Sequence, residues 1–301
     1  MTKCEEYYLK TNTEIEVILE DAAFLQHETQ RWKSKDLILS YDTDHLEQYI
    51  YSAYSPHIEN LSDSEHIMKR VMSLMLLYNG VQYITSLNLN SKVVATAIHG
   101  KGFSGNLWAS EIEEYPFEHN EDFYDNSCFK YSDTSLDSVL FDLTKVDTTI
   151  RVLLFLAGLI SRPNTFEDSI LNWGTLYKIY DTVNHGCKEA DIDINTLIPK
   201  SKIKALTATC NNMSILGLNS RHGLKDYGSP PTNVINDLEE AVFTVLCLSK
   251  NFVIEYIKKV HNITYKGKNC ELSDYAARVF SHYSKADYDE FKNSDFWETL
   301  N

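Results

Sequence analysis

Long apolar runs and closely spaced cysteines are both missing from this sequence of 301 residues. The longest apolar stretch, residues 152–160, is too short to cross a bilayer, so we expect no membrane-spanning helix. The six cysteines include no CxxC pair, which excludes the common zinc motifs. We therefore expect no metal site, no disulfide and a location in the reducing cytoplasm. The charged first residues do not resemble a secretory signal peptide.

Motifs of common enzyme classes are also missing. The sequence contains no GxxxxGKS/T, GxGxxG, GxSxG or HExxH pattern and no kinase signature. The stretch His99–Gly100–Lys101–Gly102 resembles a phosphate-binding loop only superficially. No cofactor is therefore predicted.

Glycine and proline are scarce, with 11 and 6 residues, while 43% of the chain is hydrophobic and 24% is charged. Such a composition is typical of a folded globular protein. The net charge is −15, which disfavours a nucleic-acid partner unless basic residues gather on one face. The basic clusters, at residues 200–204 and 258–268, are short, and solvated surface is the preferred interpretation of both.

The first half of the chain has an α+β pattern. Apolar and polar residues alternate over residues 14–20, and residues 36–41 and 93–98 are further candidate strands, the last one pairing with a strand over 108–117. Apolar spacing predicts a helix over residues 64–87, capped by Ser62 or Ser64. The polar, acidic stretch 118–135 is a candidate boundary or active loop. We therefore predict an α+β domain with a small sheet over residues 1–135.

The second half is helical by its apolar periodicity, which predicts an all-α helical bundle over residues 136–301. The first expected helix starts at Asp147 or Thr148 and ends before Pro163. The next two cover residues 167–185 and 199–216, and the last long helix is capped by Asn236. The first of them is apolar nearly all round and should be central. Gly186 is the expected residue after the second helix. Phe155 and Trp173 should be buried.

A glycine-rich loop carries the best candidate site residues: Asn219, Ser220, Arg221 and His222. A histidine can transfer a proton near neutral pH, and an arginine can bind a phosphate or carboxylate in a fork. Neighbouring glycines would let a ligand approach the backbone closely. In the structural alternative, Arg221 pairs with an acid such as Asp226 and His222 caps a helix carbonyl.

A weaker cluster lies near the start of the helix over residues 64–87. His57 and His66, with three acidic residues between them, could place several metal ligands together. A solvated acidic cap is the preferred interpretation, so no metal site is predicted there.

Three stretches, NWGTLYKIYDTV, SRHG and DLEEAVFTVLCLSKNFV, resemble the helical domains of the HEPN superfamily, especially the abortive-infection type of bacteria. The resemblance implies a helical bundle, dimerisation, and a role in antiviral defence or a toxin–antitoxin system. Active HEPN ribonucleases carry an Arg, a few spacer residues and then a His. Here Arg221 and His222 are adjacent, so the ribonuclease site is not carried over intact.

Three functions follow as hypotheses. The first is a binding or regulatory component of a bacterial defence or stress-response system, with a protein partner or a second copy on its helical domain. The second is a metal-independent, RNA-cleaving effector that uses Arg221 and His222. The third is an acidic protein that mimics nucleic acid. Catalysis would bring Arg221 and His222 together in a cleft, whereas mimicry would line acidic side chains along one face.

Overall fold

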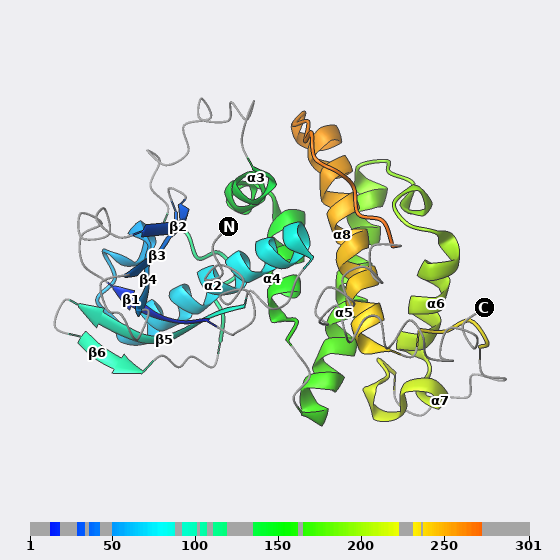
Figure 1. Cartoon of the computed structure of the whole chain (residues 1–301), viewed down its shortest axis with the longest axis horizontal. Coiled ribbons are helices and arrows are strands. Elements are labelled where there is room, and N and C mark those ends of the chain that lie inside the picture. The colour runs from blue at the N-terminus through cyan, green and yellow to red at the C-terminus, as the bar shows by residue number, and fades with distance from the viewer. Residues whose placement is uncertain are drawn as a thin grey trace, which may run out of the picture. The chain divides into compact units, whose positions relative to one another are not determined.

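The computed structural model describes residues 13–18, 29–33, 36–42, 50–87, 92–100, 103–106, 111–118, 135–161, 165–222, 231–235 and 237–272. Helices account for most of these residues (Figure 1). The chain divides into two compact units, Met1–Gly186 and Cys187–Asn301. This division falls later than the domain boundary at 135/136, which stays a prediction because residues 119–134 lie outside the described part of the chain.

Six strands lie among the described residues of the first unit. They are β1 (Thr13–Ile18), β2 (Thr29–Lys33), β3 (Ile38–Asp42), β4 (Ile50–Tyr54), β5 (Val93–Gly100) and β6 (Phe103–Asn106). Their order is β2-β3-β4-β1-β5-β6. The first strand is parallel to both neighbours, β4 and β5, while the other pairs are antiparallel. The alternation of apolar and polar residues within a strand does not reveal which strands pair. The sequence-based prediction did not include β2, β4 or β6.

The predicted strand over 108–117 is wrong for its described part, since residues 111–118 form no strand. The polar groups here bond to α2 (Ser64–Ser86) instead of a sheet neighbour. The Glu113 amide donates to Ser73 Oγ at 2.7 Å, and the Glu113 carboxylate accepts two hydrogen bonds from Arg70, at 2.8 and 2.9 Å.

Helix α2 matches the predicted range, but its cap is Asp63 and neither predicted serine. The Asp63 carboxylate accepts the His66 amide at 2.8 Å, where a negative charge also favours the helix dipole. Further along α2, the side-chain amide of Asn79 accepts from the Val93 N–H and donates to the Val93 carbonyl, both at 2.8 Å. These buried bonds attach α2 to the start of β5.

Helix α3 (Leu136–Leu143) precedes α4 (Thr148–Leu159), which crosses α2 at very short range. A Cβ added to Gly80 would lie 2.0 Å from the Leu154 carbonyl oxygen, and one added to Gly158 would lie 2.0 Å from the Leu76 oxygen. Each helix therefore needs a glycine where the backbone of the other approaches. The expectation of a central α4 holds for one face only: Leu153 and Leu154 are buried, whereas Val152 and Leu159 are exposed.

The predicted helical second half is confirmed for most of the described residues from 148 to 262, whereas residues 263–272 form no helix. Phe155 and Trp173 are buried, as predicted. Helix α5 (Phe166–Glu189) continues past Gly186, the expected end. Asp191 takes the left-handed conformation instead, with φ 51°. The Ile192 N–H bonds to the Cys187 carbonyl at 2.8 Å, which closes the helix end as a Schellman motif.

The second unit contains the end of α5 and three further α-helices among its described residues. They are α6 (Lys200–Asn211), α7 (Met213–Leu216) and α8 (Leu238–His261), joined by the single turns η6 (Ile194–Thr196) and η7 (Gly217–Asn219). The predicted helix over 199–216 is broken at Asn212, whose side chain accepts the Ser214 amide at 3.0 Å and caps a new helix. Asp237 caps α8; Asn236, the predicted cap, lies outside the described residues.

Cys247 and Cys270 form a disulfide, so the expectation that all six cysteines are free is wrong. The bond joins the middle of α8 to a segment more than twenty residues later, and no spacing motif reveals such a pair. Cys187 and Cys210 are free and buried. Burial raises the pKa of the Cys187 thiol to about 11 and that of Cys210 to about 12.

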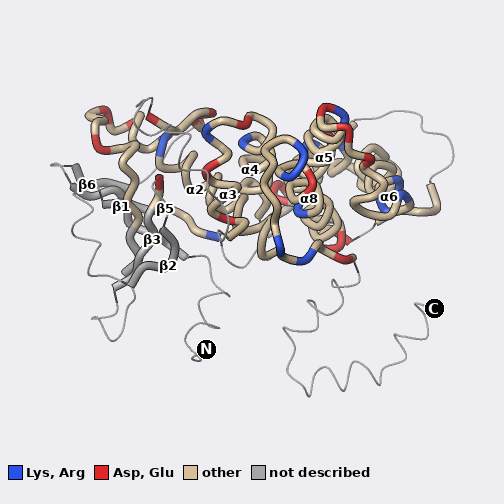
Figure 2. The backbone as a smooth tube through the Cα atoms, turned by 90° about the horizontal axis from the view of Figure 1, so that it is seen from above, with Lys and Arg blue, Asp and Glu red and all other residues tan. Residues whose placement is uncertain are grey.

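Within the described part of the chain, no helix is both long and apolar enough to cross a membrane. Helices α2 and α8 each carry charges of both signs (Figure 2). In α8 the acidic residues of the first turn and the basic residues of the last turn both favour the helix dipole.

Candidate functional site

The predicted site residues lie at the end of η7. Arg221 is exposed and His222 is half-buried. The Arg221 N–H donates to the Cys210 carbonyl at 2.8 Å, and Ser220 Oγ donates to the His222 carbonyl at 2.5 Å. Both bonds fix the backbone of the turn. Asp226, the acid expected to pair with Arg221, lies outside the described residues, so the roles of Asn219, Ser220, Arg221 and His222 stay predictions.

A buried polar cluster joins distant parts of the first unit. The Asp36 carboxylate lies 2.9 Å from His57 Nε2 and 2.6 Å from Lys145 Nζ, and Asp36 is 0% exposed. His57 Nδ1 accepts the Glu118 N–H at 3.0 Å, so the proton of the neutral ring is on Nε2 and points at Asp36. Burial raises the pKa of Asp36, but the His57 hydrogen bond and the Lys145 charge together lower it below 3.8.

Both ring nitrogens of His57 are therefore engaged, and the cluster is best interpreted as structural. Arg70 strengthens it, since its guanidinium donates to the His57 carbonyl at 2.8 Å while holding Glu113. The solvated acidic cap expected around His57 is wrong for His57 itself, which is buried. The cluster attaches residues 111–118 and the end of α3 to the start of α2.

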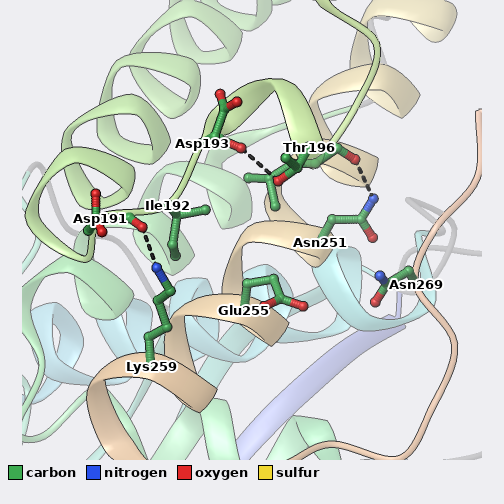
Figure 3. A pocket seen from close by; sticks show the side chains of 9 residues that line it. Asp191, Ile192, Asp193, Thr196, Asn251, Glu255, Lys259 and Asn269 are labelled. Atoms are coloured by element: carbon green, nitrogen blue, oxygen red, sulfur yellow. Dashed lines mark hydrogen bonds between the residues drawn. The ribbon is translucent and has the colours of Figure 1, made fainter.

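A cavity of about 340 Å³ lies in the second unit (Figure 3). It is formed by the turn after α5, one face of α8 and the segment before Cys270. Its lining residues are Asp191, Ile192, Asp193, Thr196, Leu197, Asn251, Glu255, Lys259 and Asn269. Neither Arg221 nor His222 is among them. Most of these side chains are polar, so the cavity suits a polar ligand better than an apolar one.

The turn after α5 is held rigidly by its own hydrogen bonds. Asp193 caps η6 by accepting the Asn195 amide at 3.0 Å and the Asn195 side chain at 2.7 Å. The hydrogen bond from the Asn195 backbone amide lowers the pKa of Asp193 most, and the one from the Asn195 side chain lowers it further. Lys259 Nζ donates to the Asp191 carbonyl, which places a cation at the end of α5. In Figure 3 the carboxylates of Asp191 and Asp193 point away from Lys259.

Asn251 forms the inner wall of the cavity. Its side-chain nitrogen donates to the Leu197 carbonyl at 2.9 Å and to the Cys270 carbonyl at 3.0 Å, and its oxygen accepts the Cys270 N–H at 2.7 Å. One buried side chain thus joins α8, the turn after α5 and the disulfide-bonded segment. Since its bonds are already made, Asn251 shapes the cavity and leaves ligand binding to its neighbours.

Glu255 is the half-buried carboxylate of this cavity, one turn along α8 from Asn251. It makes no hydrogen bond or ion pair with any residue that the structure describes. Lys259 stands four residues further on, a spacing at which Glu and Lys commonly pair, but its ammonium bonds to the Asp191 carbonyl. Figure 3 shows Glu255 pointing towards Asn269 across the cavity. The cavity therefore presents a carboxylate that is not engaged by any described residue.

Sequence reasoning missed this cavity because its residues come from three separate stretches of the chain. The available signal was weak: Glu255 and Lys259 share one face of α8, and Asp191 and Asp193 follow the end of α5. Within the described residues, no group of three His, Cys, Asp or Glu side chains is placed to hold a metal ion. An organic ligand with hydrogen-bond donors is the chemistry that the lining fits.

Comparisons with known proteins returned nothing: no family model, no curated protein and no solved structure matches this chain. The case for function therefore depends on the chemistry of the cavity.

Proposed function

We propose that the chain is a binding or regulatory protein whose helical second unit binds a small organic cation in the cavity at Glu255. The observation that carries the proposal is the Glu255 carboxylate, which lies in a polar cavity and pairs with no residue in the described part of the chain. A half-buried carboxylate without a partner has lost part of its hydration, and a ligand ammonium or guanidinium would restore the lost interaction.

The size of the cavity supports a small ligand. Its volume of about 340 Å³ is at the lower end of the range of about 300–1,000 Å³ found for ligand sites. The Glu255 carboxylate, which accepts hydrogen bonds and cannot donate them, also favours a ligand rich in N–H groups. An aliphatic amine such as spermidine has this size and chemistry.

The biological setting in this proposal comes from the HEPN-like resemblance. It is a bacterial defence or stress-response system in the cytoplasm, in which the helical region contacts a protein partner or a second copy of the chain. Ligand binding next to the end of α8 would then act on that contact. Sedimentation with and without spermidine tests this part, and a ligand-dependent change in mass is expected.

Calorimetric titration with spermidine tests the binding itself. Glu255→Gln keeps the shape of the side chain and removes its charge. A charge-assisted hydrogen bond contributes about 1.5–3 kcal/mol, so the variant should bind about 10–100 times more weakly. Glu239→Gln is the matched control, because Glu239 is an exposed carboxylate on the first turn of the same helix.

The proposal requires three results together: binding to the native chain, weaker binding to Glu255→Gln, and unchanged binding to Glu239→Gln. Equal loss in both variants would indicate a general attraction to an acidic protein. Binding should also weaken moderately with salt, as expected for one partly buried ion pair.

A further inference from the structure

The segment after α8, residues 263–272, runs back along the helix that precedes it; we refer to it as the return segment. Helix α8 ends at His261, yet Cys270 is bonded to Cys247 in the middle of that helix. Fourteen helical residues span roughly 21 Å, which nine residues can cover because they reach roughly 30 Å when fully extended. Figure 1 shows the orange segment descending beside α8.

The return segment is fixed at its two ends. At its start, the Ile263 N–H donates to the Ile257 carbonyl at 3.1 Å. At its end, Cys270 is buried, with its disulfide to α8 and its two backbone bonds to Asn251. Between these points residues 264 and 266–269 are exposed. The position of this stretch therefore depends on the anchor at Cys270.

That anchor borders the cavity. Asn269, directly before Cys270, lines the side of the cavity that faces Glu255 (Figure 3). Asn251 lines the cavity and holds Cys270 at the same time. Four residues, one helical turn, separate Cys247 from Asn251, so the covalent and the hydrogen-bonded anchor lie side by side on α8.

We infer that the Cys247–Cys270 bond is a redox-responsive anchor that sets the wall of the cavity and so controls ligand binding there. The control of ligand binding rests on the proposed function. The movement of the cavity wall rests on the geometry of the disulfide and of Asn251 alone. Disulfides that occur in the cytoplasm are usually transient and redox-sensing, so the proposed location fits a responsive bond.

The chemical step is reduction by a dithiol. One thiolate of the dithiol attacks a sulfur of the pair, the S–S bond breaks, and a mixed disulfide forms. The second thiol of the reductant then displaces the remaining cysteine sulfur. Two electrons and two protons pass to Cys247 and Cys270, which become thiols, and the dithiol becomes a cyclic disulfide.

The free cysteines of the described region do not compete in this exchange. Cys187 and Cys210 are buried, and their raised pKa values keep them as thiols, which are poor nucleophiles. After reduction, Cys270 keeps its hydrogen bonds to Asn251 but loses its covalent link to α8. The return segment then opens more often, because opening no longer stretches a covalent link.

Amide hydrogen exchange of the full chain tests the movement without any ligand. Dithiothreitol should speed exchange of the Cys270 amide by at least about tenfold. The Ile263 amide is the internal control and should change by less than about twofold, since its bond lies at the other end of the segment. The double variant Cys247→Ser with Cys270→Ser should match the reduced protein. Unchanged exchange at Cys270 in both samples would overturn the inference.

Spermidine titration of the oxidised and reduced protein tests the control of binding. Reduction should weaken binding by about tenfold or more while the circular dichroism of the helices stays unchanged. Equal affinity in the two states would overturn the inference and leave the proposed function standing. If neither state binds spermidine, the proposed function fails for this ligand, and binding control fails with it; the exchange experiment still decides whether the bond fixes the wall.

Discussion

Asn251 and Cys270 exchange two hydrogen bonds, at 2.7 and 3.0 Å, between a side-chain amide on α8 and the backbone of the return segment. The same amide donates to the Leu197 carbonyl at 2.9 Å. Three parts of the second unit therefore meet at a single buried side chain, and this junction forms one wall of the cavity. We therefore expect both the stability of this unit and the proposed ligand binding to depend on Asn251.

Replacing Asn251 by alanine should lower the free energy of unfolding by about 2–4 kcal/mol. The reason is that the buried amide and carbonyl groups of Cys270 and the Leu197 carbonyl would lose their partners. Urea unfolding of oxidised protein measures the change. Asn233→Ala is the control: its side chain makes one exposed bond of 3.3 Å to the Ser201 carbonyl, so a change within about 0.5 kcal/mol is expected. An equal loss of unfolding free energy in the two variants would show that the hydrogen bonds of Asn251 contribute no more than one exposed bond.

The crossing of α2 and α4 should tolerate no side chain at its two glycine positions. Gly80→Ala and Gly158→Ala each place a Cβ 2.0 Å from a backbone oxygen, and overpacking of this kind costs about 1–3 kcal/mol or more. Gly174→Ala is the opposite case, because nothing lies within 4 Å of its added Cβ. That variant should stabilise α5 by about 0.5–1 kcal/mol. Thermal unfolding of the three variants checks the signs, and a stable Gly80→Ala protein would contradict the described crossing.

Much of the helical structure could be predicted because helices depend on local spacing. The ranges of α2, α4 and α8 follow from apolar residues three and four positions apart. Helix α3 has only eight residues and offers too little periodicity. The predicted cap of α2 was wrong by one residue, because Asp63 lies between the two candidate serines. Neighbouring polar residues are equally good caps by sequence, and only the backbone conformation decides which one caps the helix. Strand pairing and the 247–270 disulfide depend on long-range contacts that spacing does not encode.

Acid should weaken the first unit through Asp36. Its folded pKa lies below 3.8, the value expected in the unfolded chain. The stabilisation is thus complete above that pH and is lost as the pH falls towards the folded value, because the unfolded state then binds a proton that the folded state does not. Asp36→Asn should cost about 3 kcal/mol at pH 7, since the buried Lys145 loses its 2.6 Å ion pair and keeps the longer one to Asp142, at 3.5 Å.

Unfolding measured between pH 6 and roughly pH 2.5 distinguishes the variants. Asp36→Asn should show a shallower loss of stability below about pH 4 than the native chain. Glu114→Gln removes an exposed carboxylate of the same unit and should follow the native curve. Parallel curves for the native chain and Asp36→Asn would mean that Asp36 is not the group that titrates.

Arg221→Ala and His222→Ala should change the free energy of unfolding by only about 0.5 kcal/mol. Arg221 is exposed, and its 2.8 Å bond to the Cys210 carbonyl uses the backbone N–H, which alanine keeps. Spermidine binding should also be unchanged, because neither residue lines the cavity. A fluorescent RNA incubated with the same proteins tests the nuclease hypothesis: cleavage by the native chain that both substitutions abolish would establish it in place of a purely binding role.

The residues of the candidate site differ in how well the sequence alone could predict them. Arg221 and His222 were predicted as site residues because they are adjacent and flanked by glycines, which is a local feature of the sequence. Glu255 lacks any such signal: in sequence it is one of many acids, and with Lys259 four residues later it resembles an ordinary surface ion pair. Only the fold shows that Lys259 bonds to the Asp191 carbonyl, so that Glu255 has no ion-pair partner among the described residues.

The most direct test of ligand binding at Glu255 is the carboxyl ¹³C resonance of that residue, followed by NMR during a spermidine titration. Its assignment comes from the signal that disappears in Glu255→Gln. We expect this resonance to shift progressively and to saturate at the affinity that calorimetry gives, while the Glu239 resonance stays in place. A Glu255 resonance that does not move while spermidine binds elsewhere on the protein would contradict the proposed site.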